Sequence, residues 1–400
     1  MRRRVAVTGL GAICALGSDV PTIWSALQAG RSGIGPIRGI PTTRLLASIA
    51  AEIIDFDAGA HFDSRRLPLL DRTAQFAVVA AREAVQAAAL PPDTAQAHRR
   101  GAILAAAIGQ SSLDAAYLSL YGEGASRVHP LTVPRVMPNA PASHLSMEFG
   151  LRGPSYAVAS ACASANHAMC LAADAIRAGR ADVMLTGGAD ASIVVGVFKS
   201  WEALRVLSAD ACRPFSRDRS GLVLGEGAAI LVLEDWDHAQ RRGATVLAEI
   251  AGSGMSADGL DLTAPDAGGA AFAMQAALDD AALDAAEIGY VNAHGTGTRL
   301  NDRIESAALL QVFGRPPPVS SSKSMIGHCL SAGGALEAVA TIMALRDGVL
   351  PPTAGFREAD PECDVDCVPN VARAVPIQAA LSNSFAFGGL NAVLAFRRAA

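Results

Sequence analysis

The feature that most constrains the fold of this chain is an alternation of short apolar runs with alanine-rich segments along 400 residues. Apolar runs of about four to eight residues are typical of buried strands, and apolar residues spaced three and four apart are typical of helices. This order predicts an α/β fold in which helices cover largely buried sheets. In the first part of the chain we expect strands at 5–8, 102–108, 182–186 and 228–234, and helices at 20–29 and 71–89.

The same rhythm restarts after Arg241-Arg242-Gly243. We therefore predict two similar halves, residues 1–245 and 246–400. The prediction rests on the order of elements alone, because no sequence repeat between the halves supports it. In the second half we expect strands at 246–251, 288–292, 318–321 and 391–397, and helices at 269–282, 301–313 and 333–347.

Composition excludes several classes of protein. The residues are 51% apolar and 18% charged, so the chain can bury a large core, and the net charge of −5 provides no global attraction to nucleic acid. No apolar run reaches about 18 residues, which argues against a membrane span. Arg2-Arg3-Arg4 leads directly into a strand, without a signal-peptide pattern. We expect a cytoplasmic protein with no nucleic-acid partner.

The seven cysteines do not suggest a disulfide framework, because they are odd in number and widely spread. Only Cys363 and Cys367 are close together, and no histidine lies near them. Their spacing is a poor match to a zinc site, so we expect no bound metal.

Gly9-Leu10-Gly11 follows the first strand and superficially resembles a dinucleotide-binding turn. The third glycine of that motif is missing, and no acidic residue is evident about 20 positions further on. The sequence therefore disfavours a nicotinamide cofactor.

Cys162 lies where an extended run, residues 154–161, gives way to an alanine-rich helix that ends near Gly179. The amides and the positive dipole end of that helix would favour the thiolate over the thiol. This position is typical of a nucleophile. The alternative is a buried cysteine that only packs tightly, since unpaired cysteines are often buried.

Two histidines follow predicted strands in similar glycine-rich contexts. His294 ends the run Tyr290 to Ala293, and His328 follows Ser320 to Gly327. Residues at the carboxyl ends of strands in α/β folds face the usual ligand crevice. Either histidine alone could be structural, but together with Cys162 they indicate an active site.

Five motifs carry a resemblance to a known family: Ala161-Cys162-Ala163-Ser164, Gly225-Glu226-Gly227-Ala228, 292–298, 323–328 and 383–389. Over essentially the whole chain, the sequence resembles the β-ketoacyl-acyl-carrier-protein synthases of the elongating, type II kind. The resemblance implies the thiolase fold, with two similar αβαβα halves in five layers. Residues 160–167, 201–205 and 212–216 most resemble the nodulation protein E branch of that family.

The resemblance implies a decarboxylative Claisen condensation. Cys162 would take an acyl chain from the phosphopantetheine of an acyl carrier protein, so the chain itself would bind no cofactor. The backbone amides of Cys162 and Phe387 would form an oxyanion hole, and Phe385 and Phe387 would form a gate. His294 and His328 would stabilise the enolate left when malonyl-carrier protein loses carbon dioxide.

Supporting roles also follow from the resemblance. Lys323 would hold the charge balance around His328, and Glu337 would orient it. Asp302 and Glu305 would support the site near Lys323. The pantetheine amides would bind to Thr296 and Thr298, and the acyl pocket would be lined by Ile108 and Trp201; Trp201 could instead be a core residue.

Two positions depart from the family pattern, one in the gate and one just after it. Ala386 stands where a glycine is usual, which narrows the backbone conformations available to the gate, and Leu390 stands where a threonine is usual.

The resemblance to this family also implies partner proteins. Carrier proteins are acidic, so Arg65, Arg66, Arg127 and Arg205 are candidates for their docking surface, unless they are ordinary solvated arginines. The resemblance implies a homodimer. A partner-dependent or catalytically silent subunit of a ketosynthase/chain-length-factor heterodimer is the alternative, but a silent subunit would lack Cys162, so we expect an enzyme. Fatty-acid and specialised polyketide or modified-lipid pathways both remain open.

Overall fold

The computed structural model describes residues 2–106 and 110–399, and within these ranges ten strands form one mixed sheet. The strand order is β10-β9-β13-β14-β8-β1-β7-β6-β4-β5. Ile108 lies outside the described residues. The strands are β1 (Val5–Cys14), β4 (Arg100–Ala106), β5 (Ser155–Val158), β6 (Val183–Asp190), β7 (Gly227–Asp235), β8 (Ala248–Ala257), β9 (Ile288–Asn292), β10 (Val319–Ser320), β13 (Ala379–Ala386) and β14 (Leu390–Arg398).

The two sides of this sheet have the same topology. In each side, the first strand in the chain pairs antiparallel with the last one, and the other three strands run parallel to one another. The corresponding strands of the two sides are β1 and β8, β7 and β14, β6 and β13, β4 and β9, and β5 and β10. Only Ala6 and Val7 of β1 pair with β8. This likeness supports the proposed division at residue 245, which stays a prediction.

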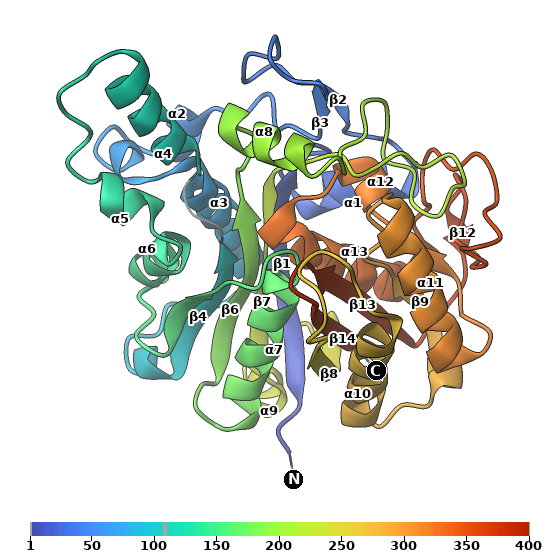
Figure 1. Cartoon of the computed structure of the whole chain (residues 1–400). Coiled ribbons are helices and arrows are strands. Elements are labelled where there is room, and N and C mark those ends of the chain that lie inside the picture. Colours follow the sequence, from blue (N-terminus) through green and yellow to red (C-terminus); the bar gives the residue numbers. More distant parts are fainter. Residues whose placement is uncertain (1, 107–109, 400) are drawn as a thin grey trace.

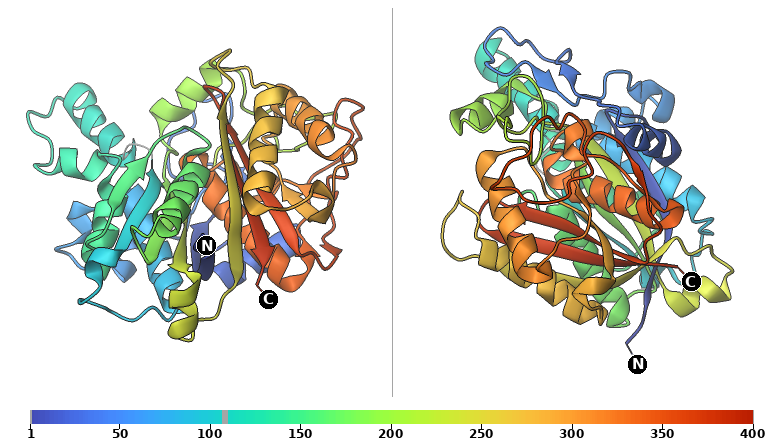
Figure 2. Two further views of the ribbon diagram at one scale, coloured as in Figure 1. Left: turned by 90° about the horizontal axis from the view of Figure 1, so that it is seen from below. Right: turned by 90° about the vertical axis from the view of Figure 1, so that its right-hand side faces the viewer.

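Helices complete five layers, as expected for the thiolase fold (Figures 1 and 2). The outer layers contain α3 (Arg72–Ala87) and α6 (Ala140–Phe149) on one side and α10 (Ala267–Ala281) and α11 (Arg299–Phe313) on the other. The middle layer holds α7 (Ser164–Arg177) and α13 (Gly333–Asp347), which contact each other and strands of both sides. Every residue of α13 up to Leu345 is buried, which is typical of a helix enclosed on all sides.

Other elements lie around this frame. The helices are α1 (Val20–Gln28), α2 (Ala58–His61), α4 (Gln110–Tyr117), α5 (Thr132–Val136), α8 (Val195–Ala203), α9 (Trp236–Arg241) and α12 (Lys323–Ile326). Strand β2 (Gly35–Pro36) pairs with β3 (Ile49–Ala50), and β11 (Val349–Leu350) pairs with β12 (Arg373–Ala374). Within the described ranges, no helix is long and apolar enough to cross a membrane.

The glycine pair near the N-terminus serves packing. A Cβ on Gly9 would lie 2.1 Å from the Ala84 carbonyl oxygen, and one on Gly11 would lie 1.9 Å from that of Ala80. Helix α3 therefore approaches β1 closely only because both positions lack a side chain. The prediction that this strand ends at Thr8 is wrong, because it continues through both glycines to Cys14.

Candidate active site

Cys162 lies at the tight connection between β5 and α7. The preceding residue, Ala161, has a φ of +48°, a left-handed conformation that is costly for a residue with a side chain. The Ser164 hydroxyl donates to the Ala161 carbonyl at 2.6 Å and accepts from the Ser160 amide at 2.7 Å. These bonds hold the turn that presents the thiol at the start of the helix.

His328 is the direct partner of this thiol. Its Nε2 lies 3.0 Å from Cys162 Sγ, and its backbone is bonded to Val223 and Gly225. Burial raises the pKa of Cys162 to about 11, with Lys323 opposing the shift. Burial, and then Lys323, lowers the pKa of His328 well below its usual range. Both shifts favour a neutral thiol and a neutral imidazole, and they oppose the effect of the helix dipole on the thiolate.

His294 faces the same thiol from the end of β9. The two imidazole rings are nearly perpendicular, with centroids 5.4 Å apart. Lys323 Nζ lies 3.3 Å from His294 Nδ1, and burial, then Lys323 and His328, lower the pKa of His294 well below its usual range. A neutral ring whose Nδ1 accepts from an ammonium carries its hydrogen on Nε2. His294 is thus a neutral hydrogen-bond donor.

Lys323 and Glu337 form a buried ion pair, each with 1% of its side chain exposed. Burial raises the pKa of Glu337, and Lys323 opposes the shift. Lys323 contacts His294 directly and acts on His328 through its charge, as the expected charge balance around His328 requires.

Glu305 and Asp302 support the loop that carries His294, the residue that Lys323 contacts. Glu305 accepts from the amides of His294 and Gly295 at 2.8 and 2.7 Å, and burial raises its pKa to about 7. Asp302 accepts from the amides of Phe215 and Gly297 at 2.9 and 3.2 Å. Both carboxylates therefore fix the backbone that carries His294.

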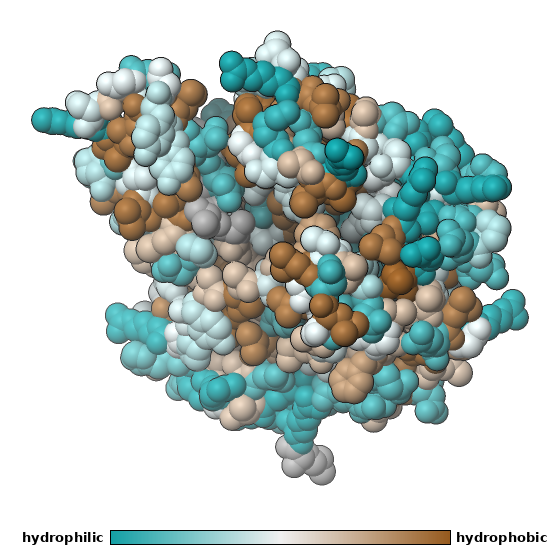
Figure 3. Space-filling view, in the orientation of Figure 1, coloured by the Kyte–Doolittle hydropathy of each residue, from teal (hydrophilic) through white to brown (hydrophobic). Residues whose placement is uncertain are grey.

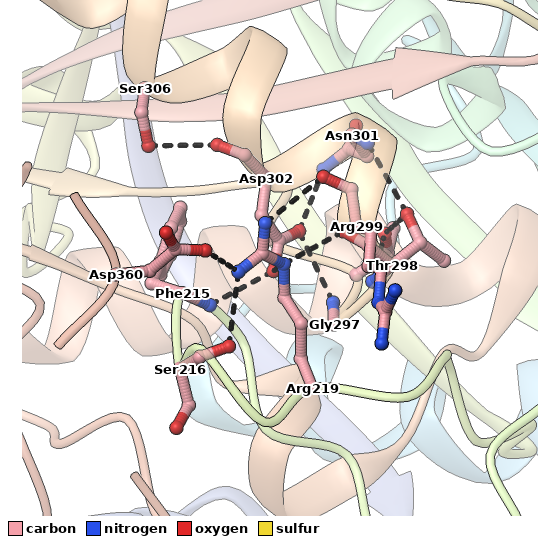
Figure 4. A network of polar contacts seen from close by, with 12 residues as sticks. Phe215, Ser216, Arg219, Gly297, Thr298, Arg299, Asn301, Asp302, Ser306 and Asp360 are labelled. Carbon is pink, nitrogen blue, oxygen red and sulfur yellow. Dashed lines mark hydrogen bonds and ion pairs between the residues drawn. The ribbon is translucent and has the colours of Figure 1, made fainter. Parts of the chain in front are cut away.

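Arg219 joins this support to the rest of the loop and was missed in the sequence (Figure 4). It is 2% exposed, pairs with Asp302 and Asp360, and donates to the carbonyl oxygens of Thr298 and Arg299 at 3.2 and 3.0 Å. A buried arginine that binds several carbonyls orders the chain around it. The charge-rich run 213–219 within a charge-poor chain was the signal for it.

Asp190, at the end of β6, was also missed. It is fully buried and accepts from the Ser331 hydroxyl at 2.7 Å and from the Ser331 amide at 3.3 Å. Burial raises its pKa to about 6. Because Ser331 follows His328 by three residues, Asp190 ties the His328 segment to the opposite half of the sheet.

Two cavities meet at Cys162. One, of about 120 Å³, is lined by His294, His328, Thr296 and Thr298, together with Phe385. The other, of about 600 Å³, extends towards α4 and α8. Cys162, Trp201 and Phe387 line both. The thiol is thus open to one ligand from each side.

The aromatic rings of Trp201 and Phe387 stack at this junction, with centroids 5.8 Å apart and planes at 23°. Ala386 lies in the extended strand β13, so its Cβ causes no strain here. Positive φ values occur instead at Gly388 and Gly389, +86° and +67°. The backbone freedom of this segment therefore lies after Phe387.

The arginines named as a docking surface have different environments. Arg65, Arg127 and Arg205 are exposed, whereas Arg66 forms an ion pair with Glu148. Arg205 lies next to Val206, which lines the 120 Å³ cavity. Of the four, Arg205 has the clearest connection with the site.

The Cys162, His294 and His328 ligand atoms lie within 4.8 Å of one another, a spacing that could also hold a metal ion. The buried ammonium of Lys323 beside His294 disfavours a second positive charge there. The arrangement suits a nucleophile, its base and a second hydrogen-bond donor.

Comparison with known families agrees with this geometry. The model of the beta-ketoacyl synthase N-terminal domain matches residues 2–239, and that of the C-terminal domain matches residues 247–357. The chain belongs to the beta-ketoacyl synthase family. It is therefore a condensing enzyme of the acyltransferase type, as predicted.

Relatives of this synthase cover the chain from end to end. Nodulation protein E of Rhizobium sp. (strain N33) is 51% identical over all of both chains, which confirms the predicted branch. The 3-oxoacyl-[acyl-carrier-protein] synthase 2 of Staphylococcus aureus (strain COL) is 40% identical, covering 99% of this chain and 98% of that one. The solved ishigamide ketosynthase/chain length factor superposes with a TM-score of 0.95 at 38% identity and covers all of both chains.

Proposed function

We propose that this synthase condenses malonyl-carrier protein with an acyl chain held on Cys162. The observation that carries the proposal is the position of the Cys162 and His328 pair where two cavities meet. One cavity would hold the acyl chain and the other the arm of the carrier. Two substrates can then reach one sulfur in turn.

The first half-reaction loads the cysteine. His328 Nε2 takes the thiol proton as Sγ attacks the acyl thioester, and the proton passes to the departing pantetheine sulfur. The amides of Cys162 and Phe387 would bind the oxyanion, and such a donor contributes about 3 to 4 kcal/mol in well-studied enzymes. His328 thus acts as base and then as acid.

The second half-reaction forms the carbon–carbon bond. Malonyl thioester loses carbon dioxide, and its electron pair moves onto the thioester oxygen as an enolate. His294 donates to this oxygen from Nε2, and its bond strengthens as the negative charge develops. After loading, a shift of the His328 ring hydrogen from Nδ1 to Nε2 would make this ring a second donor to the same oxygen, and no described residue bonds to Nδ1 to oppose the shift. The enolate carbon then attacks the acyl carbonyl, the bond to Sγ breaks, and the departing thiolate takes a proton from water to regenerate the thiol.

We assign the carrier arm to the smaller cavity. The hydroxyls of Thr296 and Thr298 lie 2.9 Å apart on its wall and can bind amides of phosphopantetheine. Arg205 would meet the acidic carrier at its entrance, with Arg65, Arg66 and Arg127 as weaker candidates. The synthase itself needs no bound cofactor for these steps. The relation to nodulation protein E favours a specialised modified-lipid or polyketide pathway over housekeeping elongation.

We propose a homodimer that assembles in the cytoplasm through the edge strand β5 and the adjoining lobe. Exposed edge strands and large apolar patches are typical of interfaces. Figure 3 shows apolar residues gathered on the lobe around α4 at the upper left. Exposed apolar side chains there and on β5 are Tyr117, Leu118, Tyr121, Leu131, Val133 and Tyr156.

A heterodimer is the second candidate assembly, because the chain is similar to a ketosynthase/chain length factor. Cys162 and both histidines would make this chain the catalytic subunit. Native mass spectrometry of the purified chain distinguishes the two: a homodimer active alone supports our proposal, and an inactive monomer supports a missing partner.

The roles assigned to Cys162 and His294 are tested by measuring acyl loading separately from decarboxylation. We expect the intact mass of the synthase to rise by one acyl group when it is mixed with acyl-carrier protein, and His294→Ala to load equally while failing to release carbon dioxide from malonyl-carrier protein. Equal loss of both steps in His294→Ala would contradict the division of roles.

A further inference from the structure

A second chamber of about 910 Å³ adjoins the acyl cavity. Four residues line both: Asp114 and Tyr117 from α4, Val194, and Gly196 from α8. We call this place, where the two chambers adjoin, the throat. The first chamber, at about 600 Å³, already has the size of a cavity that encloses a whole small-molecule ligand. Only a long acyl chain would reach the throat.

The throat is polar where an alkyl chain would need an apolar wall. Asp114 is half-buried, and from the residues that the structure describes its carboxylate receives no hydrogen bond or ion pair. A Cβ on Gly196 would lie 3.4 Å from Asp114 Oδ1, so the carboxylate reaches α8 across the throat. Gln110, one helical turn earlier on α4, adds a second polar side chain to the first chamber.

The second chamber is polar too. Its wall includes the exposed side chains of Arg38 and Arg44, for which no carboxylate partner occurs among residues 2–106 and 110–399. Arg72 and Glu226 pair with each other on the same wall. A saturated chain that extended past Asp114 would exchange hydrated charged groups for methylene contacts, which is unfavourable.

We propose that Asp114 selects long acyl chains that carry a hydroxyl group at the depth of the throat. A hydroxyl donates to the carboxylate and replaces the water it loses, whereas a methylene leaves the carboxylate unpaired. Asp114 is then a specificity-determining residue for the distal part of the acyl group. The inference rests on the proposed function, because it assumes that the acyl chain occupies the first chamber.

The test compares octanoyl-, hexadecanoyl- and hydroxyhexadecanoyl-carrier proteins, the last with the hydroxyl at successive positions along the distal half. We expect one hydroxy isomer to exceed hexadecanoyl by about tenfold in kcat/KM, from the cost of an unpaired polar group. In Asp114→Leu this preference should disappear or reverse, with octanoyl serving to normalise the rates. Asp237→Asn, an exposed change on α9, is the control and should keep the wild-type ratios.

Gly196→Val provides a second variant in case Asp114→Leu folds poorly. Its larger side chain would narrow the throat, so hexadecanoyl and all its hydroxy isomers should lose rate relative to octanoyl. If the synthase condenses the octanoyl group but prefers no hydroxy isomer over hexadecanoyl, the inference about Asp114 is wrong while the proposed function stands. The inference is also wrong if Asp114→Leu accepts long saturated chains faster while the wild type shows no preference for a hydroxyl group. Asp114 would then only limit the length of the acyl chain. Failure of octanoyl itself would instead contradict the proposed function.

Discussion

The ammonium of Lys323 lies 3.3 Å from Nδ1 of His294 and also forms an ion pair with Glu337. This contact fixes both the charge and the tautomer of the histidine. A positive charge so close disfavours the imidazolium, and its hydrogen bond to Nδ1 leaves Nε2 as the donor. Lys323 therefore prepares His294 to stabilise negative charge without giving up its proton.

The substitution Lys323→Met tests this role through pH. Without the ammonium, the pKa of His294 rises towards its usual value, so the ring begins to protonate at a higher pH than in the wild type. The acidic limb of kcat for malonyl decarboxylation should therefore move to higher pH, and kcat should fall about 100-fold.

Lys323→Met also leaves Glu337 buried without its partner, at a cost of roughly 3 to 5 kcal/mol in the free energy of unfolding. The variant with both Lys323→Met and Glu337→Gln should recover part of this stability while the acidic limb stays shifted. An unchanged pH profile in a folded variant would contradict the assignment.

Glu305→Gln should slow decarboxylation while Cys162 still accepts an acyl group. A glutamine side chain cannot accept from the amides of His294 and Gly295 with both of its terminal atoms, so one amide is left unpaired at about 1 to 3 kcal/mol. Separate rates for acyl loading and for carbon dioxide release check this. Glu362→Gln, an exposed change, is the matched control. Equal slowing of both steps would indicate general unfolding of the site.

Trp201 should influence which acyl chains are accepted. Trp201→Ala removes the ring stacked on Phe387 and enlarges the junction of the two cavities, so the product profile should shift to longer chains. Trp201→Phe keeps a smaller stacked ring and should give an intermediate profile. A loss of thermal stability with an unchanged profile would make Trp201 a core residue only.

Charge reversal separates the candidate docking arginines. Arg205→Glu should raise the KM for carrier protein about tenfold at low salt, and the difference should shrink as salt screens the interaction. Arg66→Glu should have a smaller effect, because Glu148 already pairs with Arg66. Arg180→Glu is the control: it lies beyond the C-terminal end of α7, whose other end adjoins Cys162. Equal KM values for Arg205→Glu and Arg180→Glu would refute this docking surface.

Many strands and helices could be predicted from the sequence where the spacing of apolar residues agrees with the residues that start or end an element. The strand 288–292 and the helix 333–347 have the predicted bounds, the helix starting at a glycine pair and stopping at Gly348. Strand β13 was missed because Ser382, Asn383 and Ser384 interrupt its apolar pattern, although all three are buried. Helix α4 was missed because its first half is mostly polar, so the helix has no strong apolar stripe.

The site was only partly predictable for a different reason. The motifs identified Cys162, His294 and His328, but which histidine Lys323 would contact depends on a turn of α12 that no spacing determines. Asp190 and Arg219 act through loops that are far from them in the sequence. Contacts of this kind become visible only when the strands are placed side by side.

The central claim is that Cys162 carries the acyl chain during condensation. The most direct measurement mixes the purified synthase with malonyl-carrier protein and a series of acyl-carrier proteins, and follows the intact masses of the carriers. We expect β-ketoacyl-carrier protein lengthened by two carbons, absent with Cys162→Ser, over a limited range of chain lengths. Product formed equally by Cys162→Ser, or malonyl-carrier protein left unchanged with every acyl carrier and no acyl group on Cys162, would contradict the account.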